Sequence, residues 1–230
     1  QSKLATIDWS PILGNQSARV TSRVKTRATL VEKLRRHPKA ALQTIRDIAG
    51  VRFEASMSLT TQDAVTETIA HLFDGTCVVE VLDLRDAHHF GYRAKHLELR
   101  FDQRGWRAEI QVRTDLQATW ANLYEVAADV FGRSIRYAPV SPDDPSFATV
   151  NALQSLSLDF VAPLESQLDA VTAQELIVED IRRLHLSGDL EGELNKLASI
   201  RSSTEPAKLA LSQELQRLTH EFEKIRGRGA

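Results

Sequence analysis

The sequence contains a single cysteine, Cys77, in 230 residues. No intramolecular disulfide can form, and no metal site built from several cysteines is available, which fits a reducing compartment such as the cytoplasm. No apolar run approaches the roughly 18 residues of a membrane span, and the N-terminus lacks the basic-then-apolar layout of a signal peptide. We therefore expect a cytoplasmic protein without a membrane partner. A hydrophobic share of 42% excludes a disordered chain.

Acidic and basic residues nearly balance, with a formal net charge of −2, but they are unevenly distributed. Residues 1–52 contain eleven Lys and Arg against three Asp and Glu, a net charge of +8, so the remainder carries −10. Such a segment is typical of proteins that bind polyphosphates or nucleic acids, because cations concentrate anionic ligands. A solvated helix face is the more common explanation of a charge run, so charge alone does not establish such binding.

The hydrophobic pattern predicts an α+β fold, a mixed β-sheet flanked by helices and followed by a helical C-terminal region. We expect strands where β-branched or alternating apolar residues occur, at 48–55, 76–84, 94–102 and 106–114. We expect helices at 26–36, 61–73 and from Thr114-Asp115 to about Phe131. The cations at 23–25 are expected to enter the first of these helices.

A proline-rich stretch at 138–147 suggests a boundary. It predicts a first domain at 1–137, a linker at 138–149 and a helical region at 150–230. The last region carries a stripe of apolar residues spaced 4, 3, 4 and 3 apart: Leu211, Leu215, Leu218, Phe222 and Ile225. About two heptads are too few for a free-standing coiled coil, so we expect an antiparallel helical hairpin or a subunit contact.

Candidate catalytic residues lie on one predicted strand and just before another. Glu109 and Gln111 are two residues apart and therefore share one face of their strand. Asp47 precedes another strand, so the two carboxylates could hold Mg²⁺ against phosphate oxygens. Two solvated carboxylates at strand ends are the alternative that spacing alone leaves open.

Five short motifs, in this order, resemble the synthetase domain of the RelA/SpoT alarmone synthetases over residues 17–137. They are SRVKTRATLVEKL at 22–34, RDIAGVRF at 46–53, FGYRAKH at 90–96, EIQVRT at 109–114 and QATWANL at 117–123. The resemblance implies a nucleotidyltransferase-like synthetase fold. It also implies transfer of the β,γ-pyrophosphate of ATP to the 3′-hydroxyl of GDP or GTP, the activity of a GTP/GDP pyrophosphokinase that makes (p)ppGpp.

By matching motif, the resemblance assigns ATP binding to four cations. Arg23 and Arg52 would sandwich the adenine, and Lys25 would hold the phosphates together with Arg27. Guanidinium planes stack on aromatic rings while keeping their charge, so the assigned chemistry is physically reasonable.

The same resemblance assigns catalysis to three residues. Asp47 would bind Mg²⁺, and Glu109 would share the metal or accept the proton of the attacking hydroxyl. Gln111 would orient the ribose. Positioning and electrostatics supply most of the catalysis in phosphoryl transfer, so no covalent intermediate is implied.

Acceptor binding is assigned to Tyr92, which would stack on the base, and to His96 and His88. Family members commonly have a basic residue and a small polar one before the Gly-Tyr-Arg triplet. Here His88 and Phe90 occupy those places. Because the side chain of Phe90 offers no hydrogen-bond partner to a guanine edge, the identity of the acceptor stays open.

Three hypotheses for the function follow. The first is a Mg²⁺-dependent small synthetase acting on a purine nucleotide. The second is a toxic relative that pyrophosphorylates the 3′ end of tRNA or makes (p)ppApp, for which an antitoxin partner is expected. The third is a catalytically degenerate assembly protein. In each case we expect self-association through residues 150–225.

Overall fold

The computed structural model describes residues 1–36, 48–86, 89–101, 106–184 and 190–228. Asp47 and His88 lie outside these ranges. Within the described residues the chain forms two compact units. One comprises Gln1–Met57, Thr61–Ala87 and Arg93–Asp115, and the other comprises Ser58–Thr60, His88–Tyr92 and Leu116–Ala230.

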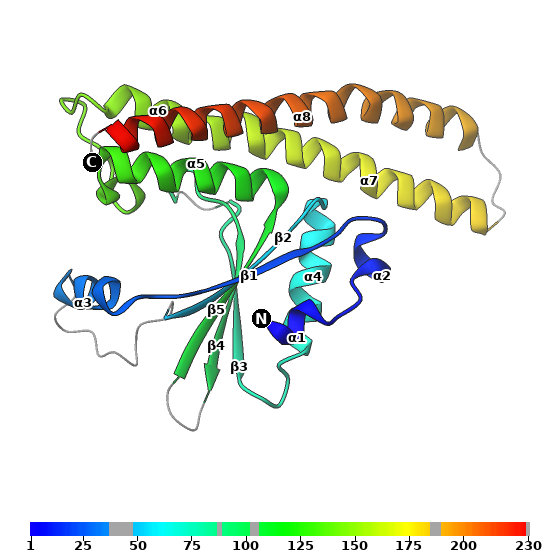
Figure 1. The fold of residues 1–230 in the computed structure, drawn as a ribbon. Coiled ribbons are helices and arrows are strands. Elements are labelled where there is room, and N and C mark those ends of the chain that lie inside the picture. The colour runs from blue at the N-terminus through cyan, green and yellow to red at the C-terminus, as the bar shows by residue number, and fades with distance from the viewer. Residues whose placement is uncertain (37–47, 87–88, 102–105, 185–189, 229–230) are drawn as a thin grey trace. The chain divides into compact units, whose positions relative to one another are not determined.

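The first unit is built on a five-stranded sheet in the order β1-β2-β5-β4-β3 (Figure 1). The strands are β1 (Arg19–Val24), β2 (Ala49–Ala55), β3 (Val78–Asp83), β4 (Lys95–Phe101) and β5 (Trp106–Thr114). The pairing of β2 with β5 is parallel, and the other three pairings are antiparallel. This is the predicted mixed sheet.

Strand β1 was not among the predicted elements. Only Val20 of its six residues is half-buried and the other five are exposed, so the edge strand carries no alternation of apolar residues. Arg23 therefore lies in a strand and does not enter a helix. The expected helix begins later, as α3 (Arg27–Arg36).

One face of the sheet is apolar and packs against short helices. These are α1 (Ser2–Ala5), α2 (Ser10–Leu13) and α4 (Leu59–His71). The core of this face includes Phe53, Leu97, Ile110 and Val112, all at most 2% exposed. The side-chain amide of Gln62 donates to the carbonyl of Val112, so α4 also satisfies a backbone acceptor of the sheet.

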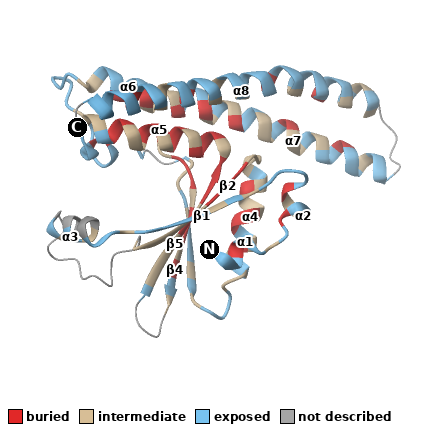
Figure 2. Cartoon of the chain, in the orientation of Figure 1, coloured by how far each residue is buried: buried red, intermediate tan, exposed pale blue. Residues whose placement is uncertain are grey.

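The second unit is helical. It comprises α5 (Asp115–Phe131), η2 (Arg133–Arg136), α6 (Phe147–Ser155), the π-helical turn η3 (Leu156–Val161), α7 (Ala162–Arg183) and α8 (Leu190–Arg228). Buried residues concentrate on α5 (Figure 2), where Trp120 and Leu123 are at most 1% exposed. The boundary between the units follows β5. It does not coincide with the proline-rich stretch, which lies within the helical unit.

The predicted C-terminal hairpin is present, since α7 and α8 pack together through Val171, Val178 and Leu197. The apolar stripe of α8 contacts a different cluster. Leu215 and Phe222 are buried with residues of α5 and α6, and the ring of Phe222 lies 5.6 Å from that of Phe131. Most residues of the stripe therefore pack within the helical unit.

Candidate active site

The second face of the sheet is polar. Strand register gives this face alternate residues of all five strands, with Glu109 and Gln111 in the middle. The charged and amide side chains that share it are Arg19, Arg23, Arg52, Glu54, Arg107, Glu109, Gln111, Arg113, His96, Glu98, Arg100 and Glu80. The apolar residues between them, such as Ile110 and Val112, are buried on the opposite face, as the alternation predicts.

Glu109 is held on both sides by neighbouring side chains. The Nδ1 atom of His96 on β4 lies 2.8 Å from Oε1 of Glu109, and Nε2 of Gln111 donates to Oε2 at 2.8 Å. The His96 and Glu109 side chains are only 10% and 13% exposed. The sheet therefore fixes the direction of this carboxylate before any ligand binds.

The hydrogen-bonded chain continues beyond Gln111. The Nη2 atom of Arg113 donates to Oε1 of Gln111 at 2.5 Å, and Nη1 of Arg113 lies 3.9 Å from Oε1 of Glu54. Arg19 of β1 makes an ion pair with the other oxygen of Glu54. Sequence reasoning missed Arg113, Glu54 and Arg19. The i, i+2 spacing in EIQVRT already places Arg113 beside Gln111 and was the available signal.

The four cations assigned to ATP lie on and beyond β1 and β2. Arg23 faces Gly50 across the β1–β2 pair, so Arg52 is its diagonal neighbour on the same face. Diagonal neighbours are about 7–8 Å apart, which leaves room for one flat ring between two guanidinium planes. The backbone N–H of Lys25 donates to the carbonyl of Ile48, which extends the pairing by one residue beyond the strand. Arg27 is exposed at the first residue of α3.

The position beside Glu109 on β2 is Gly50. Among the described residues, an added Cβ there would have one neighbour within 4 Å, the backbone carbonyl oxygen of Arg23 at 3.7 Å. With no side chain at this position, the described part of the sheet has room for a small group beside Glu109.

Two predicted site residues, Asp47 and His88, lie outside the described residues, so their roles stay predictions. Tyr92 belongs to the helical unit, where it packs, half-buried, against the buried cluster of α5 and α6. Its stacking on an acceptor base also stays a prediction. The site residues that were predicted on strands of the sheet share one face: Arg23, Arg52, His96, Glu109 and Gln111.

The residues before Tyr92 form a tight turn. Phe90 and Gly91 both have positive φ, at 53° and 82°, and the N–H of Tyr92 donates to the carbonyl of His89. Two successive positive φ angles with this hydrogen bond are the features of a type I′ turn, which favours Asn-Gly. Phe90 therefore occupies a position that suits a small polar residue.

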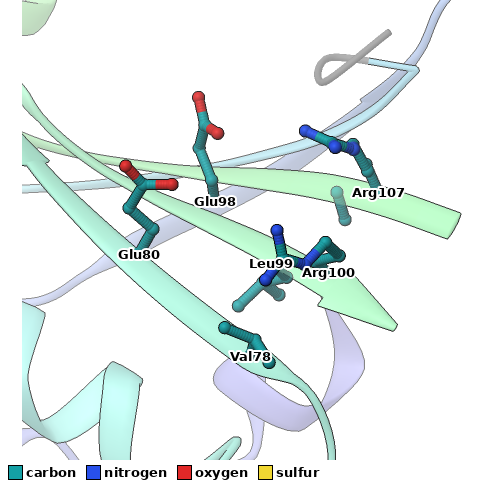
Figure 3. Close-up of a pocket in the computed structure, with 7 residues that line it drawn as sticks. Val78, Glu80, Glu98, Leu99, Arg100 and Arg107 are labelled. Carbon is teal, nitrogen blue, oxygen red and sulfur yellow. The ribbon is translucent and has the colours of Figure 1, made fainter. Parts of the chain in front are cut away.

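A small pocket lies farther along the polar face, between β3, β4 and the beginning of β5 (Figure 3). Glu80 and Glu98 are cross-strand partners on one side, and Arg100 and Arg107 are cross-strand partners on the other. Glu98 is also the β4 partner of Glu109. This pairing makes Glu98 a useful control position.

A cluster of four charges joins α4, β3 and β4. Arg85 lies 2.5 Å from Asp83 and 2.9 Å from Asp63, and Lys95 lies 2.5 Å from Asp63. Burial acts to raise the pKa of Asp83, but hydrogen bonds and charge from Arg85, together with the charge of Lys95, outweigh it and lower the pKa. Sequence reasoning did not find this cluster.

The chemistry of the site suits Mg²⁺ in part. Glu109 offers the hard carboxylate oxygens that Mg²⁺ prefers, and Gly50 leaves space next to them. The described residues contain no group of three or more His, Cys, Asp and Glu that could hold a metal ion. The second predicted ligand, Asp47, lies outside them, so the two-carboxylate site stays a prediction.

A fixed carboxylate beside a row of cations, on one face of a mixed sheet, is an arrangement suited to phosphate chemistry. Comparison with known proteins gives a match to one protein family. Residues 22–130 match the model of the region found in RelA and SpoT proteins. Over these residues, just under half of its length, the chain is therefore similar to RelA and SpoT proteins.

Curated relatives include the uncharacterised proteins Rv1366 of Mycobacterium tuberculosis and Mb1401 of Mycobacterium bovis. Each is 51% identical over 118 residues, which is 51% of this chain and 42% of the relative. The chain thus matches less than half the length of these relatives. Among solved structures, small alarmone synthetase 1 from Bacillus subtilis bound to its product pppGpp has a TM-score of 0.47 at 23% identity, covering 67% of this chain and 75% of that one.

In the part of the chain that the structure describes, no helix is both long and apolar enough to span a membrane.

Proposed function

We propose that this protein is an alarmone synthetase, which transfers the β,γ-pyrophosphate of ATP to the 3′-hydroxyl of GDP or GTP and releases AMP. The observation that carries the proposal is the fixed Glu109 carboxylate, held by His96 and Gln111 on the face that also presents Arg23 and Arg52. The match of residues 22–130 to the RelA and SpoT region supports it.

The cations would bind the donor nucleotide. Arg23 and Arg52, diagonal neighbours on one face, would hold the adenine between their guanidinium planes, which stack on aromatic rings and remain charged. Lys25 and Arg27 follow at the end of β1 and the start of α3, where positive charge would bind the triphosphate.

Glu109 would act on the acceptor. Its carboxylate accepts the proton of the 3′-hydroxyl while the 3′-oxygen forms a bond to the β-phosphorus of ATP. The bond from that phosphorus to the α,β-bridging oxygen breaks, and AMP leaves with that oxygen. Because His96 and Gln111 already orient the carboxylate, little reorganisation is needed at the moment of transfer.

Mg²⁺ bound at Glu109 and Asp47 would neutralise charge on the phosphate oxygens during transfer. Tyr92 and His88 would bind the acceptor base and phosphates, and His96 would contribute beside Glu109.

The experiment is a product assay with a matched pair of variants. Purified protein is incubated with ATP, Mg²⁺ and one of GDP, GTP, GMP, ADP or deacylated tRNA, and AMP and the acceptor product are separated by chromatography. We expect AMP and a 3′-pyrophosphorylated guanine nucleotide in equal amounts. If product forms only on tRNA or only on ADP, the guanine nucleotide is not the acceptor, and the hypothesis of a toxic relative replaces this one.

Glu109→Gln should lower the rate by at least about 100-fold, because general-base catalysis contributes about 10²–10⁴-fold. Glu98 is the cross-strand partner of Glu109, and Glu98→Gln removes the same charge at that position. This control should keep the rate within about twofold of the wild-type rate. Equal effects of the two substitutions, or no product with any acceptor, would refute the proposal.

A further inference from the structure

The amide of Gln111 has one orientation that satisfies both of its neighbours. An arginine guanidinium only donates hydrogen bonds and a carboxylate only accepts them, so the amide oxygen must face Arg113 and the amide nitrogen must face Glu109. The distances agree, with 2.5 Å from Arg113 Nη2 to Gln111 Oε1 and 2.8 Å from Gln111 Nε2 to Glu109 Oε2.

Arg113 is itself fixed in place. Its side chain is 2% exposed, and its Nη1 atom lies 3.9 Å from the carboxylate of Glu54, which is 6% exposed. Glu54 also pairs with Arg19 on the neighbouring strand. A planar guanidinium packed inside the sheet and facing a buried carboxylate has little freedom to turn, so the donor aimed at Gln111 is preset.

We propose that Arg113 is a positioning residue, which acts through Gln111 to hold the Glu109 carboxylate in its reactive direction. This inference rests on the proposed function of Glu109. Without the Arg113 donor, the Gln111 amide keeps only one of its two partners and can turn away from Glu109, which leaves Oε2 of the carboxylate without its hydrogen bond. Gln111 thus links the buried guanidinium of Arg113 to the reacting carboxylate of Glu109, in addition to any contact with ribose.

The kinetic test compares Arg113→Met, Gln111→Leu and the double variant. We expect Arg113→Met to lower kcat by about 10–100-fold, as loss of supporting contacts around a reactive group commonly does, with the KM for ATP within about twofold. In the Gln111→Leu background, Arg113→Met should change kcat by less than about twofold, because the side chain that links Arg113 to Glu109 is already absent. Arg113→Lys keeps a donor at this position and should restore at least half of the rate.

A second readout needs no activity. The side-chain NH₂ signals of Gln111, assigned through their loss in Gln111→Leu, should move in the ¹⁵N–¹H spectrum of Arg113→Met. They should stay in place in Arg100→Met, which removes an exposed arginine from the same face. If Arg113→Met does not fold, the Arg113→Met/Glu54→Gln variant, which removes both buried charges together, takes its place.

Equal kcat losses from Arg113→Met with and without Gln111 would overturn the inference, as would Gln111 amide signals that do not respond to Arg113→Met. If the wild-type protein makes no alarmone, the proposed function fails separately. The amide signals then still decide whether Arg113 orients Gln111.

Discussion

Gly91 should tolerate no side chain, and the structure gives the size of the penalty. Its φ is 82°, and an added Cβ would lie 2.8 and 3.0 Å from the ring of Trp120 and 3.2 Å from Cα of Gln154. Trp120 cannot withdraw, because its ring is 1% exposed and its Nε1 donates to the carbonyl of Leu153 at 2.7 Å. We therefore expect Gly91→Ala to strain both the backbone and the core of the helical unit.

A left-handed conformation costs an alanine about 1–2 kcal/mol, and overpacking costs about 1–3 kcal/mol more. Gly75 is the matched control, since its φ is 68° and an added Cβ has nothing within 4 Å. Gly75→Ala should therefore cost only the first of these amounts. The difference of about 1–3 kcal/mol corresponds to at least about 2 °C in the melting midpoint for a chain of this size.

The assay is thermal unfolding followed by circular dichroism for wild type, Gly75→Ala and Gly91→Ala under one set of conditions. We expect midpoints in the order wild type, Gly75→Ala, Gly91→Ala. A Gly91→Ala midpoint equal to or above that of Gly75→Ala would refute the close approach to Trp120.

Three further outcomes are expected. Phe90→Asn should raise the melting midpoint by about 2–4 °C, because it restores Asn-Gly to the type I′ turn and relieves about 1 kcal/mol of strain; a lower midpoint would contradict this. Gly50→Val should leave the fold intact but reduce kcat/KM for ATP by about tenfold or more, since it fills the space beside Glu109, whereas Gly50→Ala should have a smaller effect. The pKa of Asp83 is lowered in the folded state, so its contribution to stability is present above about pH 4 and is lost as the pH falls further; Asp83→Asn should flatten this part of the stability curve, and an unchanged acid limb would contradict the role of Arg85.

The sequence was most informative where one face of an element is buried. The alternation in EIQVRT correctly predicted that Glu109 and Gln111 share a face opposite Ile110 and Val112. Apolar patterns also predicted the helix after β5 and the three inner strands, β2, β4 and β5, to within one or two residues, and β-branched residues predicted the edge strand β3. In the inner strands and the helix, burial of apolar residues leaves a periodic signal.

The parts that could not be predicted lack that signal. Strand β1 is exposed along nearly its whole length, so its pairing with β2 depends on backbone hydrogen bonds that composition does not reveal. The chain from Arg19 through Glu54 to Arg113 joins residues of three strands. Only the register brings them together, and no local pattern contains the register.

The most direct test of the central claim is the ³¹P spectrum of a reaction that contains the protein, ATP, Mg²⁺ and GDP. We predict that the ATP signals are replaced by those of AMP and of a diphosphate on the 3′-position of the guanine nucleotide, and that the Glu109→Gln protein leaves ATP unchanged. Conversion of ATP to ADP and inorganic phosphate, or no conversion at all by the wild-type protein, would contradict the account.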